Sequence, residues 1–305
     1  MKIKFWGVRG SIPCPGPKTQ KYGGNTACIE VRFNDNGRYI IIDAGSGIRE
    51  LGNYLVSDNH KNAPIDTDIL ITHTHWDHIM GFPFFAPIYI PDTRLRIYGP
   101  VSFENETLKD IIGGQLTYRY FPVRHAELSA TIDYINIKEG QFDLGDGIKL
   151  STTYLNHPVL CLAYRLEFQN KVFCTAYDTE PFKNLFSTDP NDPYYDEIMA
   201  QEGEKSARDE NHRVETFLEG SDLLVYDAQY TQEEYEASKI GWGHTSIEYT
   251  IEFSKLSGVK RLALFHHDPM RSDAELDELT AKYCNSRKTG KTEVFFAREG
   301  MEIEI

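Results

Sequence analysis

Short apolar runs, broken by glycine-rich turns, dominate the first third of the chain. Their length of about four to eight residues and their β-branched and aromatic content are typical of strands. On this pattern we expect strands at residues 3–6, 27–33, 38–43, 68–72, 94–98, 148–154, 160–168, 171–176, 222–226 and 261–265. Apolar positions at helical spacing predict helices at residues 48–56, 231–238, 246–257 and 273–283. Strands lead and strand–helix alternation follows, an order that fits sheets packed on each other with helices outside.

No internal repeat, coiled-coil heptad or low-complexity linker divides the chain, so we expect a single domain over residues 1–305. Residues 181–219 depart from its compact pattern, because they are polar and acidic and include Asp-Pro-Asn-Asp-Pro at 189–193. The segment is too long for an ordinary connection. We expect an insertion or a cap here that limits substrates to small molecules; a solvated excursion without a role is the alternative.

Composition and charge exclude several classes of protein. Hydrophobic residues make up 40% and charged residues 26% of the 305 residues, as in soluble globular proteins. Because neither a long apolar run nor a signal peptide is recognisable, we expect a cytoplasmic protein without a membrane partner. Five cysteines without a Cys-x-x-Cys pair argue against a disulfide framework or a thiolate zinc site. The net charge, 32 minus 46 or −14, argues against binding long nucleic acid.

One short segment concentrates four metal-ligand side chains: His73-Thr74-His75-Trp76-Asp77-His78. Three imidazoles and a carboxylate suit a borderline or hard divalent cation. The two-residue period of a strand lets His73 and His75 point the same way, while Asp77 and His78 continue around the following turn. The first pair can then hold one ion and the second pair another. The alternative, a polar loop of hydrogen-bonded histidines, is disfavoured by the density of the motif at a strand end.

This segment resembles the motif of the metallo-β-lactamase superfamily, His-x-His-x-Asp-His. Three later positions match the family in order, each after a predicted strand: His157, Asp178, and a histidine after residues 262–265. The resemblance implies an α+β fold, the αββα sandwich in which two mixed β-sheets pack together with helices outside. It also implies two divalent metal ions, zinc in the first place, with manganese or iron as alternatives.

The resemblance further implies how the ligands divide between the two ions. The first ion would be held by His73, His75 and His157, and the second by Asp77, His78 and His266, with Asp178 bridging. The last ligand stays ambiguous, because His266 and His267 are adjacent and point to opposite faces if the strand continues. The family pattern favours His266, and His267 would then support a ligand or be satisfied by Asp268.

Two further segments look like the phosphodiesterase branch of the superfamily, which includes ribonuclease Z and cyclic-phosphate and cyclic-nucleotide phosphodiesterases. They are residues 7–13 with 22–26, and Gly-Trp-Gly-His-Thr-Ser at 241–246. The resemblance implies that His244 is an extra catalytic histidine before a helix capped by Thr245 or Ser246. Its imidazole can protonate a leaving alkoxide. An exposed loop histidine is the alternative.

Two carboxylates have roles to assign beyond the ligand sets. We expect Asp77 and His244 to be the catalytic residues. Asp77 or Asp178 can orient an attacking hydroxide. Asp43 follows an apolar strand and precedes Gly-Ser-Gly, so it either supports a metal histidine or caps a turn.

These residues predict a dinuclear-metal phosphodiesterase that attacks a small, cyclic phosphodiester with a metal-bridging hydroxide. The expected partner is a small anionic substrate such as a cyclic nucleotide or a cyclic phosphate, and assembly as a homodimer is left open. The nearest alternative is a lactone or thioester hydrolase of the same fold, because the same ligands serve both reactions. A non-catalytic metal-binding scaffold is the alternative of another class, and the complete ligand set argues against it.

Overall fold

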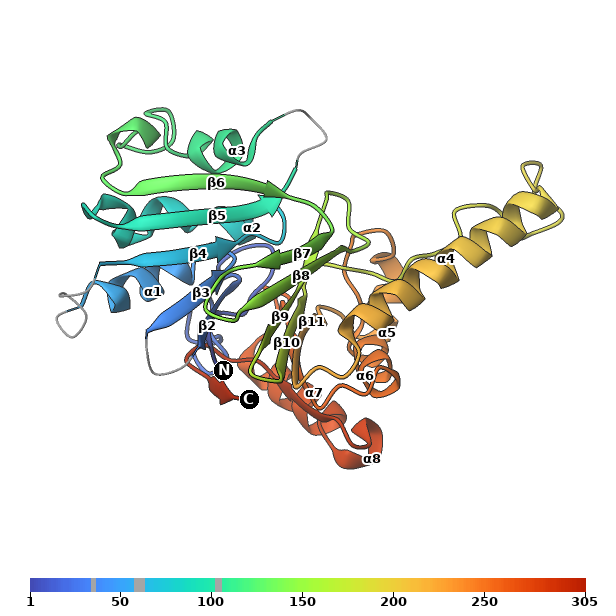
Figure 1. The fold of residues 1–305 in the computed structure, drawn as a ribbon. Helices are drawn as coiled ribbons and strands as arrows, with labels where there is room; N and C mark the ends of the chain where they lie inside the picture. The colour runs from blue at the N-terminus through green and yellow to red at the C-terminus, as the bar shows by residue number, and fades with distance from the viewer. Residues whose placement is uncertain (34–36, 58–63, 102–105) are drawn as a thin grey trace.

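Two β-sheets lie face to face at the centre of the molecule (Figure 1). The computed structural model describes residues 1–33, 37–57, 64–101 and 106–305, and in this part of the chain each sheet has seven strands. The first sheet runs from edge to edge as β14 (Glu302–Glu304), β1 (Lys2–Gly7), β2 (Cys28–Phe33), β3 (Arg38–Ile42), β4 (Asp66–Leu70), β5 (Arg94–Pro100) and β6 (Thr131–Ile137). The second runs as β13 (Glu293–Phe296), β12 (Arg261–Phe265), β11 (Leu223–Asp227), β10 (Lys171–Ala176), β9 (Leu162–Phe168), β8 (Lys149–Tyr154) and β7 (Gly140–Asp143).

Both sheets are mixed. The strands from β3 to β6 pair in parallel, and so do those from β10 to β13. The other neighbours pair antiparallel. Parallel strands bring their carboxyl ends to one edge of a sheet, which is where ligands bind in open α/β sheets. The loops that leave β3, β4, β10, β11 and β12 therefore gather at one end of the sandwich.

Apolar side chains from both sheets fill the space between them. In β2, Ile29 and Val31 belong to this inter-sheet core, and Glu30 between them points to the other face, as the two-residue period of a strand requires. Phe5 of β1 meets Phe265 of β12 across the gap, with ring centroids 6.1 Å apart. The two sheets thus share one core, and the alternation that predicts strands also selects its residues.

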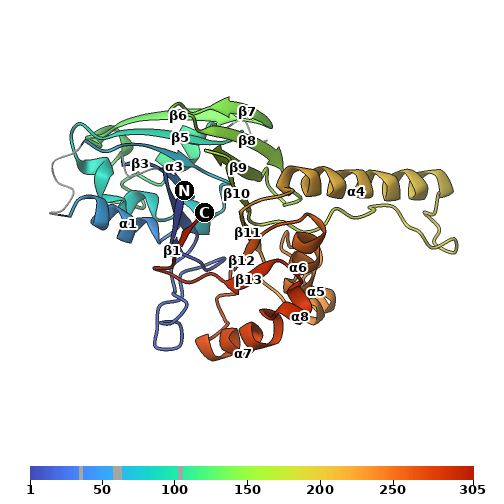
Figure 2. The same cartoon turned by 60° about the horizontal axis from the view of Figure 1, so that its bottom comes forward.

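Helices cover the outer face of each sheet (Figures 1 and 2). On the first sheet lie α1 (Ile48–Leu55), α2 (Trp76–Ile79), α3 (Leu108–Gly114) and the 3-10 turns η1 (Phe82–Phe84), η2 (Ala86–Tyr89) and η3 (His125–Glu127). On the second lie α5 (Gln232–Ser238), α6 (Ile247–Leu256), α7 (Asp273–Tyr283) and α8 (Ser286–Thr289). Two mixed sheets with helices outside confirm the α+β sandwich that the sequence predicts.

The acidic segment 181–219 is inserted between β10 and β11 and contains the long helix α4 (Glu197–Leu218). This helix of 22 residues projects beyond the sheets in both views (Figures 1 and 2). The sequence pattern does not predict it, because only four of its residues are buried and no continuous apolar stripe runs along it. At its base, Asn211 exchanges two hydrogen bonds of 2.9 Å with the backbone of Phe182.

The sequence pattern does not predict four of the described strands, and all four lie at the edges of the sheets. β6, β7, β13 and β14 are the outermost strands of the two described sheets. Edge strands commonly carry polar residues that face solvent, which avoids pairing with other chains. Their apolar periodicity is therefore weak; in β7, for example, three of four residues are exposed. The helix α3 and the early start of β4 at Asp66 also differ from the prediction.

A search of the described residues finds no helix with the length and apolar character needed to cross a lipid bilayer.

A hydrogen bond between the two sheets leads to a stability prediction. The buried Tyr164 of β9 donates its hydroxyl to the backbone oxygen of Ile71, just after β4. Tyr164→Phe leaves that end of the contact without its donor and should lower the free energy of unfolding by about 1–3 kcal/mol in chemical denaturation. Tyr39→Phe is the matched control, because the buried Tyr39 hydroxyl has no hydrogen-bond partner among the described residues. Equal effects of the two substitutions would contradict the role of the Tyr164 contact.

Candidate metal centre

The predicted ligands come together where the carboxyl ends of the strands meet. His73 and His75 lie in the extended segment after β4, and His75 is the residue that caps the amino end of α2. The helix α2 then carries Asp77 and His78 on its first turn, so the motif ends in a helix and not in a simple turn. The other ligands follow further strands: His157 after β8, Asp178 after β10 and His266 after β12.

A first group of ligands surrounds one point with imidazoles. His75 Nδ1 lies 3.1 Å from His73 Nε2 and 3.0 Å from His157 Nε2. Asp178 Oδ2 completes the group at 3.3 Å from His73 Nε2. These four residues are those that the sequence analysis assigns to the first ion, including the carboxylate expected to bridge.

A second group adjoins the first through the same carboxylate. His266 Nε2 lies 3.1 Å from Asp77 Oδ2, 3.3 Å from His78 Nε2 and 3.2 Å from Asp178 Oδ1. Asp178 Oδ2 lies 3.3 Å from His78 Nε2. Asp178 therefore faces both groups with its two oxygens. All four residues of this second group are buried.

The donor geometry fits divalent metal ions. Four ligands at zinc distances of about 2.0–2.1 Å form a tetrahedron whose edges are about 3.3 Å. The ligand-to-ligand separations of 3.0–3.3 Å in both groups match this edge. Two imidazole nitrogens at such separations face each other either through a shared proton or across a bound cation. The donor set and its spacing therefore suit one ion in each group.

The pKa shifts of the ligand residues show that the carboxylate of Asp178 depends on positive charge beside it. Burial alone would raise the pKa of Asp178, but the imidazoles of His266, His78 and His73 hold that pKa well below its usual range. Burial lowers the pKa of His157 to about 4, which keeps its ring neutral as a metal ligand must be. A buried carboxylate such as that of Asp178 is tolerated where a positive charge lies beside it.

Three of the metal-facing rings are held from behind by their other nitrogen. His78 Nδ1 donates to Asp43 Oδ2 at 2.7 Å, and His157 Nδ1 donates to the backbone oxygen of Gly243 at 2.9 Å. His266 Nδ1 lies 3.3 Å from Gln229 Oε1. Such contacts select the ring tautomer that presents Nε2 to a metal. Of the two roles left open for Asp43, the structure shows the contact with a ligand histidine.

The two adjacent histidines separate in space. His266 adopts a positive φ of 60°, so the chain turns after β12 instead of continuing as a strand. His266 enters the second ligand group, while His267 Nε2 donates to the backbone oxygen of Ala297 at 2.8 Å. The expected contact between His267 and Asp268 is replaced by this backbone contact. Burial lowers the pKa of His267 to about 3, which agrees with a neutral, structural ring.

His244 lies beside the ligands and is paired with a carboxylate that the sequence analysis missed. His244 Nδ1 donates to Asp227 Oδ2 at 2.7 Å, and its ring stacks on His266 with centroids 4.8 Å apart. Burial would lower the pKa of His244, but Asp227 overcomes this and raises that pKa to about 9. Bound cations nearby would oppose this rise. The available signal was the position of Asp227 directly after a predicted strand, the same position that identifies Asp178.

The amino-terminal loop supports the second ligand group. The backbone N–H of Ser11 donates to Asp77 Oδ2 at 2.7 Å. Gly10 lies so close to His266 that a Cβ placed there would be 2.3 Å from the imidazole. The wholly buried Arg9 ties this loop to the chain after His266, donating to the backbone oxygens of Asp268 and Arg271. The loop resembling the phosphodiesterase branch thus contacts ligands directly.

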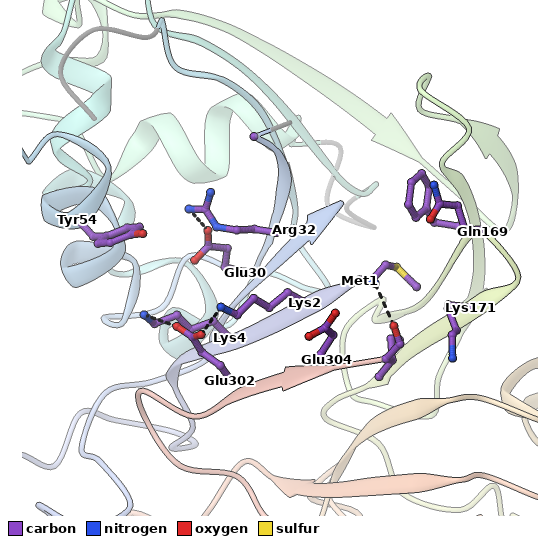
Figure 3. Close-up of a pocket in the computed structure, with 13 residues that line it drawn as sticks. Met1, Lys2, Lys4, Glu30, Arg32, Tyr54, Gln169, Lys171, Glu302 and Glu304 are labelled. Atoms are coloured by element: carbon purple, nitrogen blue, oxygen red, sulfur yellow. Dashed lines mark hydrogen bonds and ion pairs between the residues drawn. The ribbon is translucent and has the colours of Figure 1, made fainter. Parts of the chain in front are cut away.

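A hollow of about 710 Å³ lies at the opposite end of the sandwich (Figure 3). Its lining comes from β1 and β2, from Tyr54 of α1, from the carboxyl-terminal residues and from the turn before β10. Charged side chains in it pair with each other; Glu302, for example, contacts Lys2 at 2.6 Å and Lys4 at 3.0 Å. It lacks the histidines of the metal centre, so it offers no second site of the same chemistry within the described residues.

Comparisons with known proteins agree with this geometry. The family model described as Anti-Pycsar protein Apyc1 matches residues 18–212. Ribonuclease Z of Lactococcus lactis subsp. lactis is 26% identical over 300 residues, which cover 87% of this chain and 88% of that protein. Ribonuclease Z of Haloarcula marismortui is 26% identical over 332 residues, which cover 100% of this chain and 97% of that protein.

Solved structures share the fold at low sequence identity. The metallo-β-lactamase fold protein YhfI from Bacillus subtilis superposes with a TM-score of 0.64 and 17% identity over 99% of both chains. A diphosphatase of the PhnP family gives a TM-score of 0.62 and 14% identity, covering 100% of this chain and 97% of the other. Human tRNase Z, short form, superposes with a TM-score of 0.59 and 18% identity, over 100% of this chain and 99% of the other. The chain therefore has the metallo-β-lactamase fold.

The crowding of Gly10 against His266 leads to a metal-content prediction. Elemental analysis of the purified protein at full loading should find two ions per chain. Gly10→Ala should displace His266 and remove about one of them, with the first group intact. Gly16→Ala in the same loop is the control, because a Cβ there meets no atom of the described residues within 4 Å. A single ion in the wild-type protein, or two in the Gly10 variant, would contradict the assignment.

Proposed function

The chain belongs to the family of the anti-Pycsar protein Apyc1, and we propose that it hydrolyses a small, cyclic phosphodiester with the help of two divalent metal ions. Its broader class is that of a metal-dependent phosphodiester hydrolase with the metallo-β-lactamase fold. The observation that carries the proposal is the His244–Asp227 pair beside two adjoining groups of metal ligands. The named relatives, ribonucleases and a diphosphatase, all act on phosphate esters or anhydrides by their names.

The chain's own residues divide the work of the reaction. His73, His75 and His157 would hold one ion and Asp77, His78 and His266 the other, with Asp178 between them. When bound there, two divalent ions would make a water molecule more acidic and would stabilise the negative charge that develops on the phosphate. Asp178 belongs to both groups and Asp77 to the second, and either carboxylate can orient that water. Asp43 and Gln229 keep the ligand rings in place through their Nδ1 atoms.

His244 is suited to protonate the leaving oxygen. Its contact with Asp227 engages Nδ1 and leaves Nε2 for the substrate. Asp227 is wholly buried and also accepts the backbone N–H groups of Thr179 and Gln229, so it is fixed in position. A fixed carboxylate orients the imidazole and favours its protonated form. Phosphodiester cleavage releases an alkoxide, for which such a proton donor lowers the barrier.

The charge of the chain favours a small substrate. A net charge of −14 repels a polyanion but tolerates a molecule with one or two negative charges. The names of the curated relatives keep RNA as the second candidate substrate. Lactone or thioester hydrolysis is the third candidate, because the same metal ligands could serve it. A panel of cyclic nucleotides, bis(aryl) phosphates, lactones and RNA separates the three.

A substitution of His244 tests its role as the proton donor. His244→Ala should lower kcat for a cyclic nucleotide by roughly 10²–10⁴-fold, with metal content unchanged. The loss should be much smaller for bis(p-nitrophenyl) phosphate, because p-nitrophenolate leaves without a proton. His212→Ala is the control, since His212 lies exposed on α4. Loss of a metal ion would instead make His244 a ligand, and equal losses on both substrates would exclude the proton-donor role.

The inserted segment 181–219 bears on the size of the substrate that can reach the metal centre. The residue before it, Glu180, contacts the loop that carries His244, because Glu180 Oε2 accepts the backbone N–H of Gly241 at 3.0 Å. We propose that the segment restricts access to small substrates. Replacing residues 187–199 by a shorter Gly/Ser linker keeps the contacts of Glu180, Phe182 and Asn211. The shortened protein should gain activity on RNA and keep its rate on a cyclic nucleotide. Unchanged rates on both substrates in a folded protein would refute the restriction.

A further inference from the structure

In the described part of the chain, the metal centre is exposed at three neighbouring imidazole rings. The second ligand group is buried throughout, while His75 and His157 of the first group and the neighbouring His244 are partly exposed. A substrate must therefore approach past these three residues. The segments that carry them form the mouth of the site, and the side chains next to them are the first that a substrate meets.

Large apolar side chains are exposed at this mouth. Trp76, next to His75, is 77% exposed, and Trp242, two residues before His244, is 56% exposed. Burying an aromatic side chain removes 150–250 Å² from water, so leaving two tryptophans exposed forgoes a substantial stabilisation. Neither ring is needed to complete the hydrophobic clusters of the described residues, to which neither belongs. Exposed apolar surface beside a site marks a binding surface.

The loop that carries Trp242 is held at several points. Its neighbour Gly243 accepts the hydrogen bond from His157 Nδ1 and, with a φ of 80°, leaves no room for a Cβ against that ring. On the other side, Gly241 donates its N–H to Glu180 Oε2 at 3.0 Å. The N–H of Trp242 itself donates to the backbone oxygen of Lys239 at 3.1 Å. The backbone of Trp242 is thus fixed relative to a metal ligand.

The ring of Trp242 also has a defined partner on one face. Lys239 Nζ lies 4.0 Å from the centroid of the indole ring, a cation–π contact. An ammonium group on one face leaves the other for a flat group. The same lysine places a positive charge near the mouth of an otherwise acidic protein, which favours an anionic substrate.

We propose that Trp242 is a stacking platform for the base of a nucleotide substrate, and that Lys239 holds the indole ring in position. The proposal rests on the proposed phosphodiesterase function and adds the recognition of a nucleobase to it. The phosphodiester lies at the metal centre while the base rests on the indole. Stacking tolerates every base, because each has a flat π-face, so the platform selects nucleotides as a class and not one base.

Kinetics with two substrates tests the platform. Trp242→Leu should raise KM for a 3′,5′-cyclic nucleotide by about 5- to 150-fold, the range for losing one base–aromatic stack, with kcat unchanged. KM for the cyclic phosphate of a ribose that lacks the base should not change. Lys239→Gln should raise KM for the nucleotide less. Ile240→Ala is the matched control, because Ile240 is 54% exposed in the same loop and has no aromatic ring. Equal changes in KM for both substrates, or no change, would overturn the proposal.

Fluorescence gives a readout that does not depend on turnover. Tryptophan emission of the wild-type protein should be quenched by a nucleoside monophosphate and not by ribose 5-phosphate, and Trp242→Leu should abolish the quenching. Quenching that survives in this variant would assign the base to another residue, and no quenching at all would overturn the platform. If the wild-type protein hydrolyses neither cyclic compound, the proposed function fails, and the fluorescence result still decides on the base. If both are hydrolysed with equal KM, the function stands and the platform fails.

Discussion

The shared carboxylate of Asp178 is the contact on which the metal centre depends. It follows β10 in the middle of the second sheet, and its oxygens lie within 3.3 Å of imidazole nitrogens from both sheets, including those of His73, His78 and His266. A buried carboxylate is stable only beside compensating positive charge. The two ligand groups can supply or bind that charge only while the sheets stay packed, so metal binding and the packing of the sandwich stabilise each other.

The surrounding loops turn this charge requirement into a fixed geometry. Asp43, the backbone oxygen of Gly243 and the side chain of Gln229 each contact the Nδ1 atom of a ligand ring, which leaves Nε2 for a metal. Glycines allow two of these loops to approach closely, at Gly10 against His266 and at Gly243 against His157. The glycine-rich segments that resemble the phosphodiesterase branch thus have a mechanical purpose, which is to place backbone where a side chain would displace a ligand.

The sequence pattern predicts a strand or helix best where most of its residues are buried. The sequence pattern predicts the central strands because both of their faces are covered and their apolar residues are continuous, as in β11 and β12. The four edge strands are not predicted, because the burial that marks a strand is weakest at the edge of a sheet; in β7 three of four residues are exposed. The helix α4 was also missed, since it projects from the body and needs no apolar stripe. Asp227 follows a predicted strand as Asp178 does, but only the structure shows its role, because it places Asp227 against His244, 17 residues further on.

The sequence by itself determined the fold class and the candidate ligands, because the dense histidine motif and the strand-end positions that carry the family resemblance are local properties of the chain. Only the tertiary structure decided which atoms meet. It turned the chain at His266, so that this histidine enters the ligand group and His267 contacts Ala297 instead. It paired Asp43 with His78 and Asp227 with His244. These choices depend on loop geometry and on strands far apart in sequence, and neither the period nor the composition of a segment encodes a distance between such partners.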